Sequence, residues 1–257
     1  MTTEPPVEGT STTATKVLGA ATAASLAVTA LMALVVSPAD VNQQDAVRLL
    51  YLHVPTAWIA MYVSFGITTL ASALYLWPRT RSRLWDLVAG ASAEIGVLFI
   101  GLTLAIGSIW GRTTWGVWWT WDARLTTTAV MFVVYLGYLA VRRVQADPEA
   151  TARRSAIVAL AASLNVPIVH KSVEWWRTLH QPASILDERR LLDPQITGVM
   201  AATLLVAVVA FTLLYAWLMV HRFRLAVLED RLDRSQLERA IAERRAEAEL
   251  AEIQVGS

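Results

Sequence analysis

Long apolar runs divide this chain into six segments, which are separated by short polar stretches. The runs cover residues 17–36, 56–77, 84–109, 125–141, 156–169 and 196–220. They lack the period-2 or period-3.6 alternation of soluble strands and helices. All but the short run 156–169 lie near the ~20 residues that a helix needs to cross a bilayer. The pattern predicts an all-α integral membrane protein with six transmembrane helices and both chain ends on one side.

The two ends of the chain are polar and differ from each other. Residues 1–15 are rich in Thr and Pro, so we expect a disordered tail, and they lack the basic start and cleavage site of a signal peptide. From 221 the chain alternates Arg with Glu or Asp, which predicts a charged cytoplasmic helix. A solvated helix is favoured there over a partner-binding coiled segment. The predicted units are therefore 1–15, a transmembrane domain 16–220, and a helical tail 221–257.

Arginine clusters predict how the helices cross the membrane. They gather in the connections after the second and fourth runs and directly after the sixth. These clusters comprise Arg79, Arg81, Arg83, Arg142, Arg143, Arg153, Arg154, Arg222 and Arg224. Because short cytoplasmic loops carry the excess of Lys and Arg, that face is cytoplasmic. We expect a multi-pass protein of the cytoplasmic (inner) membrane, with both termini inside and the loops 37–55, 110–124 and 170–195 on the outer, periplasmic face.

The amino-acid composition is typical of a membrane protein and excludes several classes of function. Hydrophobic residues make up 55% of the 257 positions and charged ones only 17%, well below the usual quarter for a soluble domain. The absence of cysteine excludes disulfides, thiolate metal sites and covalent c-type haem attachment to this chain. The sequence contains no phosphate-binding loop of the G-x-x-x-x-G-K-[ST] type, so we expect no ATP hydrolysis, and nothing suggests nucleic acid as a partner.

Tryptophan is concentrated in one predicted outer loop. Five of the eleven tryptophans fall within twelve residues, with Gly111 and Gly116 among them: Trp110, Trp115, Trp118, Trp119 and Trp121. An aromatic belt at the membrane interface needs only one or two at each helix end. The loop instead predicts a wide aromatic surface suited to a large planar ligand.

Three motifs resemble those of a known family. The run from Trp115 to Thr126, WGVWWTWDARLT, is similar to the WWD signature of haem-handling proteins in cytochrome c maturation. The others are residues 165–182, NVPIVHKSVEWWRTLHQP, and residues 51–55, YLHVP, with Trp58. Six spans and this length resemble the CcmC family of haem exporter proteins in system I. The resemblance covers about residues 17–220, and the charged tail departs from it.

The resemblance implies a cofactor and partners. It implies b-type haem, bound non-covalently and transiently at the outer face, which is presented to a CcmE-type periplasmic chaperone. The ABC-transporter subunits CcmA and CcmB and the small CcmD would act alongside, in the lipid bilayer. Since no nucleophile, general base or metal cluster is evident, we do not expect an enzyme.

Two of the four histidines are candidate iron ligands. In the predicted topology His53 precedes the second span and His170 follows the fifth, so both lie at the level of the Trp-rich loop. Two imidazoles beside an aromatic surface can form a bis-His haem site. The resemblance also implies that the histidines at these two motif positions are the axial ligands. His180, in the same outer loop, is a candidate contact for a haem propionate or a partner.

Further residues complete the candidate site. Asp122 is expected to cap the helix that begins near Arg124, and Trp175 and Trp176 add aromatic surface. Glu94 lies inside the third span, where an acid is either functional or a hydrogen-bonded packing residue. The cations able to pair with propionates are Arg112, Arg124, Lys171 and Arg177.

Three other functions remain as alternatives. A CcsA-type subunit of system II would deliver haem directly to apocytochrome, although the span number favours the CcmC type. A membrane b-type cytochrome would move electrons, but such proteins usually place histidine pairs within their spans. A purely structural transporter subunit would leave the tryptophan cluster without a use.

Overall fold

The structure, a computed structural model, describes residues 9–144, 147–181, 196 and 198–255, and all regular secondary structure in these residues is helical. Residues 1–8 of the predicted tail and 182–195 of the predicted outer loop lie outside this description. The α-helices are α1 (Thr13–Leu31), α2 (Leu50–Trp58), α3 (Phe65–Leu76), α4 (Arg83–Trp115), α5 (Ala123–Arg143), α6 (Pro148–Ser163), α7 (Asn165–Trp175) and α8 (Gly198–Val255).

Six helical segments among the described residues are long and apolar enough to cross a membrane, which confirms the predicted fold class. Each contains or overlaps one predicted run. They are Thr13–Val36, Asp45–Leu76, Arg83–Trp115, Ala123–Arg143, Pro148–Trp175 and Gly198–Glu249.

The segments are longer than the apolar runs that predicted them, and in two of them the extension changes where a candidate histidine lies. The second begins at Asp45 rather than at 56, and the fifth covers Pro148–Trp175 rather than 156–169. Their ends carry polar residues that an apolar count leaves out, while the backbone stays helical. Consequently His53 and His170 lie within helices, and not just outside them as expected.

Proline alters the geometry of both segments. Pro55 lies inside α2 and has no N–H to donate, and the helix continues as a π-helix over Ile59–Ser64 before α3. Pro167 stands in the first turn of α7, directly after the break between α6 and α7 at Leu164. Both irregularities follow from a missing backbone hydrogen bond, and both occur near the site described below.

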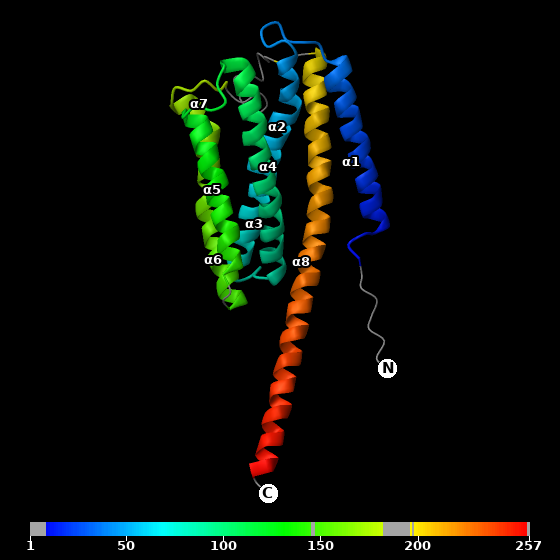
Figure 1. Cartoon of the computed structure of the whole chain (residues 1–257), viewed down its shortest axis with the longest axis vertical. Helices are drawn as coiled ribbons and strands as arrows, with labels where there is room; N and C mark the ends of the chain where they lie inside the picture. Colours follow the sequence, from blue (N-terminus) through cyan, green and yellow to red (C-terminus); the bar gives the residue numbers. More distant parts are fainter. Residues whose placement is uncertain (1–8, 145–146, 182–195, 197, 256–257) are drawn as a thin grey trace.

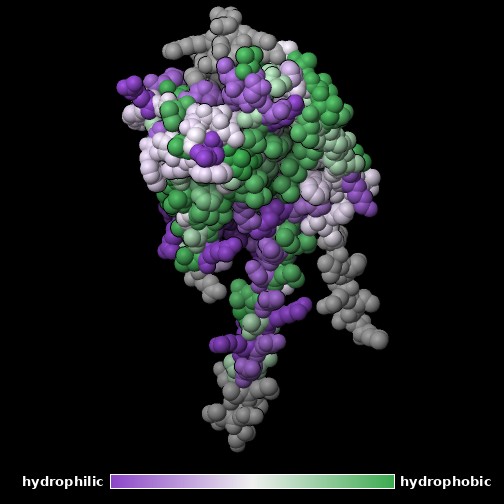
Figure 2. All heavy atoms as spheres, turned by 45° about the horizontal axis from the view of Figure 1, so that its top comes forward, coloured by the Kyte–Doolittle hydropathy of each residue, from purple (hydrophilic) through white to green (hydrophobic). Residues whose placement is uncertain are grey.

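The helices form an upright bundle, and the chain enters and leaves it at the same end (Figure 1). We call this the proximal end and the opposite one the distal end. Helix α8 packs against α1, α2 and α4, and α3 packs against α4 and α6. At the proximal end α8 continues alone, far beyond the bundle, with exposed leucines such as Leu232 and Leu237. On the face that Figure 2 shows, hydrophobic atoms cover much of the side of the bundle, whereas hydrophilic atoms predominate on this extension.

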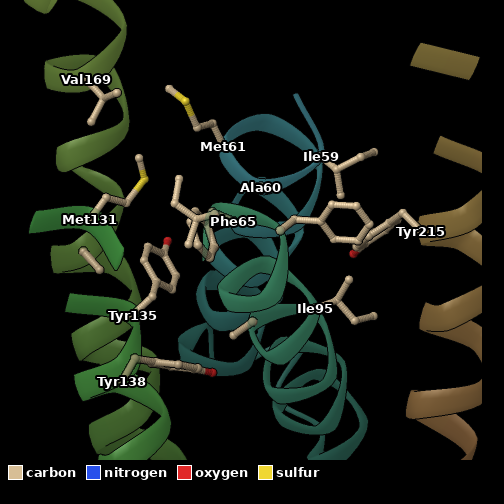
Figure 3. Packing of buried hydrophobic residues seen from close by; sticks show 14 of the residues in the cluster. Ile59, Ala60, Met61, Phe65, Ile95, Met131, Tyr135, Tyr138, Val169 and Tyr215 are labelled. Carbon is tan, nitrogen blue, oxygen red and sulfur yellow. The ribbon is translucent and has the colours of Figure 1, made fainter. Parts of the chain in front are cut away.

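The centre of the bundle is filled by aromatic and small residues. The rings of Phe65 and Tyr135 stack with centroids 3.5 Å apart, and Met131 and Val169 lie beside them (Figure 3). Gly96 of α4 faces Phe65 so closely that an added Cβ would overlap its ring. Close backbone approach at small residues is the usual means by which helices pack in lipid, where van der Waals contact replaces the hydrophobic effect.

Ion pairs join α8 to the proximal end of the bundle. Asp86 of α4 is 3% exposed and accepts hydrogen bonds from Arg142 of α5 at 2.6 Å and from Arg83 at 2.6 Å. Arg83 also pairs with Asp230 of α8 at 2.9 Å. This network links three helices through one buried carboxylate.

Candidate functional site

A cavity of about 150 Å³ lies at the distal end of the bundle, between α2 and its π-helical continuation, α4, the start of α5 and the segment after α7. Its lining is mainly aromatic and aliphatic, with a few polar groups. The lining residues are His53, Val54, Ala57, Trp58, Met61, Tyr62, Thr103, Leu104, Gly107, Ser108, Trp110, Gly111, Thr114, Trp115, Trp119, Arg124, Leu125, Thr128, His180 and Gln181.

His53 forms one wall of this distal cavity. Its ring lies over Gly107 of α4, where an added Cβ would be 2.7 Å from Cε1, and meets the Trp110 ring edge-on at a centroid distance of 5.7 Å. Nδ1 is buried and has no hydrogen-bond partner among the described residues. An unpaired buried nitrogen costs free energy, and here it belongs to a ring that lines a cavity, which points to a ligand.

His180 faces His53. The two ring centroids are 6.3 Å apart, and His180 also lies 6.3 Å from the Trp115 ring. Nδ1 of His180 is 2.7 Å from the carbonyl oxygen of Gln181. Because a carbonyl can only accept, Nδ1 carries the proton and Nε2 carries the lone pair. Burial and, secondarily, the charge of Arg124 lower the pKa of His180 from 6.5 to about 4, so the ring is neutral at neutral pH.

His170 lies behind the lining and not in it. Its Nδ1 is 2.5 Å from the hydroxyl of Tyr62, and the two rings meet edge-on at 6.0 Å. Tyr62 itself lines the cavity. The structure therefore brings His53 together with His180. The predicted partner His170 is not among the lining residues and meets the lining at Tyr62, through its side chain, and at Arg124, through its carbonyl.

The Trp-rich loop is divided between the cavity and the surface. Trp110, Trp115 and Trp119 line the cavity, and Nε1 of Trp119 is buried without a partner among the described residues. Trp118 and Trp121 are exposed, the latter at 80%. Gly116 ends α4 with a φ of +78°, in the left-handed region that favours glycine. The loop thus presents one aromatic face inward and another outward.

Asp122 caps α5 as predicted. Its Oδ1 accepts a hydrogen bond from the backbone N–H of Leu125 at 2.9 Å. The other carboxylate oxygen accepts from Thr178 Oγ1 at 2.6 Å and from the N–H of Leu179 at 3.0 Å. These two bonds, which the sequence did not suggest, join the Trp-rich loop to the segment that carries His180.

Of the four predicted cations, Arg124 alone is among the residues lining the cavity. It donates to Ser172 Oγ and to the carbonyl of His170, both at 3.0 Å. Arg112 donates to the carbonyl of Gly116, Lys171 pairs with Glu174 at 3.0 Å, and Arg177 is exposed. Arg124 is therefore the cation placed to meet an anionic group in the cavity.

The remaining candidates lie away from the cavity lining. Trp175 and Trp176 are exposed, at 58% and 52%, and meet edge-on with centroids 5.8 Å apart. Glu94 is paired with Arg222 of α8, whose Nη2 is 2.9 Å from Oε1. This ion pair gives the intramembrane acid a packing partner between α4 and α8.

Several lining residues were not among the predicted site residues, Met61 and Tyr62 among them. Trp58, which the sequence indicated only as part of a motif, also lines the cavity, and its Nε1 is buried without a described partner. The signal was present: lining residues recur at His53, Ala57 and Met61, and at Val54, Trp58 and Tyr62. Spacing by four residues from His53 marks one face of a helix.

Comparison with known proteins gives a consistent result. The family described as "CcmC: Heme exporter protein C" matches residues 4–238. A protein of Bradyrhizobium diazoefficiens named heme exporter protein C is 39% identical over 224 residues, or 87% of this chain and 82% of that protein. Proteins of the same name from Haemophilus influenzae and Escherichia coli K12 are 38% and 35% identical, covering 76% and 75% of both chains.

Proposed function

The chain belongs to the heme exporter protein C (CcmC) family, and from that premise we propose that it holds haem in the distal cavity and presents it to an acceptor protein. Family membership gives it a role in haem handling for cytochrome c maturation, as a membrane component and not as an enzyme. The observation that carries the proposal is the pair of imidazoles, His53 and His180, that face each other across an aromatic cavity.

The residues of the cavity fit haem as cargo. His53 Nδ1 has no described partner and Nε2 of His180 holds a lone pair, and unprotonated imidazole nitrogens are the usual axial ligands of haem iron. Trp115 and Trp119 supply aromatic surface for a planar macrocycle. Arg124 and the hydroxyl of Tyr62 supply polar contacts for a propionate. When bound, haem brings the iron and the vinyl groups, while the chain orients them and limits water.

The cavity must widen to admit this cargo. Its volume of about 150 Å³ is below the ~300–1,000 Å³ of pockets for drug-sized ligands. The wall formed by His180 and Gln181 belongs to residues 177–181, which are outside any helix, so it is the part that can move at least cost. Such an opening suits a protein that takes up and releases haem, and bound without a cysteine the haem would be b-type, non-covalent and transient.

The pair predicted from the sequence, His53 with His170, is the competing arrangement. It would require the side chain of His170 to leave Tyr62 and enter the cavity. The described contacts favour His180 instead, because that ring is already part of the lining.

The orientation and the partners follow from the charges and the family. Arginines gather at the proximal end, so that end is cytoplasmic and the distal cavity faces the periplasm across the inner membrane. The acceptor is a CcmE-type haem chaperone that meets the exposed tryptophans around the cavity. CcmA, CcmB and CcmD form the surrounding export complex, in which the role of this chain is positioning.

The absorption spectrum of the purified protein tests the proposal. We expect haem to co-purify with the parent in a six-coordinate form, and His53→Ala and His180→Ala each to lower haem content and change its ligation. His221→Ala is the matched control, because His221 is at the proximal end and bonds to Thr10. A parent that contains no haem when haem is supplied would overturn the proposal.

The same spectra separate the alternatives. Loss of ligation in His170→Ala, with no change in His180→Ala, would support the pair His53 and His170. Mixing the loaded protein with purified CcmE-type chaperone should move haem to that acceptor. Transfer straight to apocytochrome would indicate a CcsA-type role, and permanent retention would indicate an electron carrier.

A further inference from the structure

We infer that Asp122 is a positioning residue for His180: it holds Thr178 and Leu179 so that the His180 ring faces His53. The inference rests on the proposed function, because it assigns to His180 a place in the haem site. It concerns bonds within this chain, however, so it can be tested with and without haem.

The two oxygens of Asp122 do different work. Oδ1 caps α5 by accepting from the N–H of Leu125 at 2.9 Å. Oδ2 reaches the other loop and accepts from Thr178 Oγ1 at 2.6 Å and from the N–H of Leu179 at 3.0 Å. One side chain therefore fixes both the start of α5 and a segment more than fifty residues away in sequence.

Thr178 passes this restraint on to His180. A carboxylate can only accept, so the Thr178 hydroxyl donates its proton to Asp122. The lone pairs of the same oxygen remain, and they accept from the backbone N–H of His180 at 3.1 Å. The order Asp122, Thr178, His180 is thus a chain of hydrogen bonds with a defined direction.

The segment has little other local support. Helix α7 ends at Trp175, and residues 177–181 are outside any helix. The two bonds to Asp122 and the bond from the N–H of His180 to Thr178 hold the two residues directly before His180 and its own backbone N–H. Their loss would free His180 from the position in which its ring centroid is 6.3 Å from that of His53.

A carboxylate is required at position 122, and this allows the two roles to be separated. In Asp122→Asn the amide oxygen can still cap α5, because asparagine is as good an N-cap as aspartate. The amide nitrogen would then face the N–H of Leu179, and two donors cannot bond. The substitution should release the segment while leaving the helix cap in place.

Hydrogen exchange of the backbone amides, measured on the full chain without haem, is the first test. In the parent we expect the amides of Leu179 and His180 to be protected. Asp122→Asn should speed exchange at Leu179, and Thr178→Val should speed it at His180, each by about tenfold. Thr178→Ser keeps the hydroxyl and should restore protection, and Glu174→Gln, an exposed change on α7, is the control.

Haem ligation is the second test. Asp122→Asn and Thr178→Val should lose the six-coordinate spectrum to the same degree as His180→Ala, and added imidazole should restore it in all three. Combining Asp122→Asn with His180→Ala should cause no further loss, because both remove the same ligand. A merely structural role for Asp122 would lower the yield of protein without imidazole rescue.

The outcomes distinguish this inference from the proposed function. Equal exchange at Leu179 and His180 in the parent and in Asp122→Asn would overturn the inference, and so would an unchanged spectrum in Asp122→Asn. If the parent binds no haem, the proposed function fails, while the exchange data still decide whether Asp122 holds the segment.

Discussion

The imidazole rings of His53 and His180 face each other with their centroids 6.3 Å apart and their planes inclined by 40°. His53 belongs to α2, and its ring packs closely against Gly107 of α4. His180 belongs to a segment without regular secondary structure. One imidazole is therefore held by a helix, and the other by a segment that is tied down by side-chain hydrogen bonds. A site of this kind can open on one side while the other side keeps its geometry.

Gly107→Ala should displace His53. The new Cβ would lie 2.7 Å from Cε1 of the ring, so the imidazole or α4 must move, and misplacing a ligand by about 1 Å has large effects. We expect the variant to fold and to lose most of its haem, as measured by haem content per protein. Gly101→Ala, on the same helix but with 3.5 Å to Phe132, should keep the parent's haem content. Equal haem in the two variants would contradict the packing role of Gly107.

The sequence predicted local features of this region more directly than contacts between segments that are distant along the chain. Six apolar runs and the cap at Asp122 depend on local pattern, and the structure confirms both. The contact between His53 and His180 depends on how a loop folds back over α2 and α4, and spacing along the chain contains no such information. The sequence paired His53 with His170 from their predicted level and from the family resemblance, and that pairing stays a prediction. In the structure the fifth segment ends at Trp175 rather than at 169, so His170 lies within it.

Removing the imidazole at position 170 should reduce stability without changing iron ligation. In His170→Ala the hydroxyl of the half-buried Tyr62 loses its partner at 2.5 Å, and the loss of one such hydrogen bond costs about 0.5–1.5 kcal/mol. Thermal unfolding in detergent should fall accordingly. The six-coordinate spectrum should persist, in contrast to His180→Ala, and its loss would return His170 to the list of ligands.

The position of His180 should depend on pH in the acidic range. Its pKa in the folded chain is about 4, below the ordinary 6.5. We call the segment 177–181 docked when the His180 ring lies against His53, and undocked when it is released to solvent. The undocked segment then binds a proton more readily than the docked one. Docking is therefore fully stable above about pH 6.5 and weakens as pH falls toward 4, by up to about 1.4 kcal/mol per pH unit.

Hydrogen exchange at Leu179, compared at each pH between the parent and His180→Gln, measures this effect. Protection in the parent should fall below pH 6.5 relative to the variant, which cannot titrate at this position. The charge of Arg124 contributes to the low pKa of His180. In Arg124→Gln that pKa should therefore be higher, and the loss of protection as pH falls should be smaller. A parent and a His180→Gln variant with identical pH profiles would exclude the imidazole as the titrating group.

Asp86→Ala should destabilise the proximal end of the bundle while sparing the distal cavity. The carboxylate is 3% exposed and pairs with Arg142 and Arg83, and breaking a buried pair by removing one partner costs about 3–5 kcal/mol. Asp45→Ala is the matched control, because Asp45 is 78% exposed in its pair with Arg48 and such pairs contribute about 0–1 kcal/mol. Thermal unfolding in detergent compares the two. The double variant Asp86→Ala/Arg142→Leu should recover part of the lost stability, because no buried guanidinium is then left without its carboxylate. A further loss of stability would instead mean that Arg142 stabilises the bundle through contacts other than Asp86, such as the one with Tyr138.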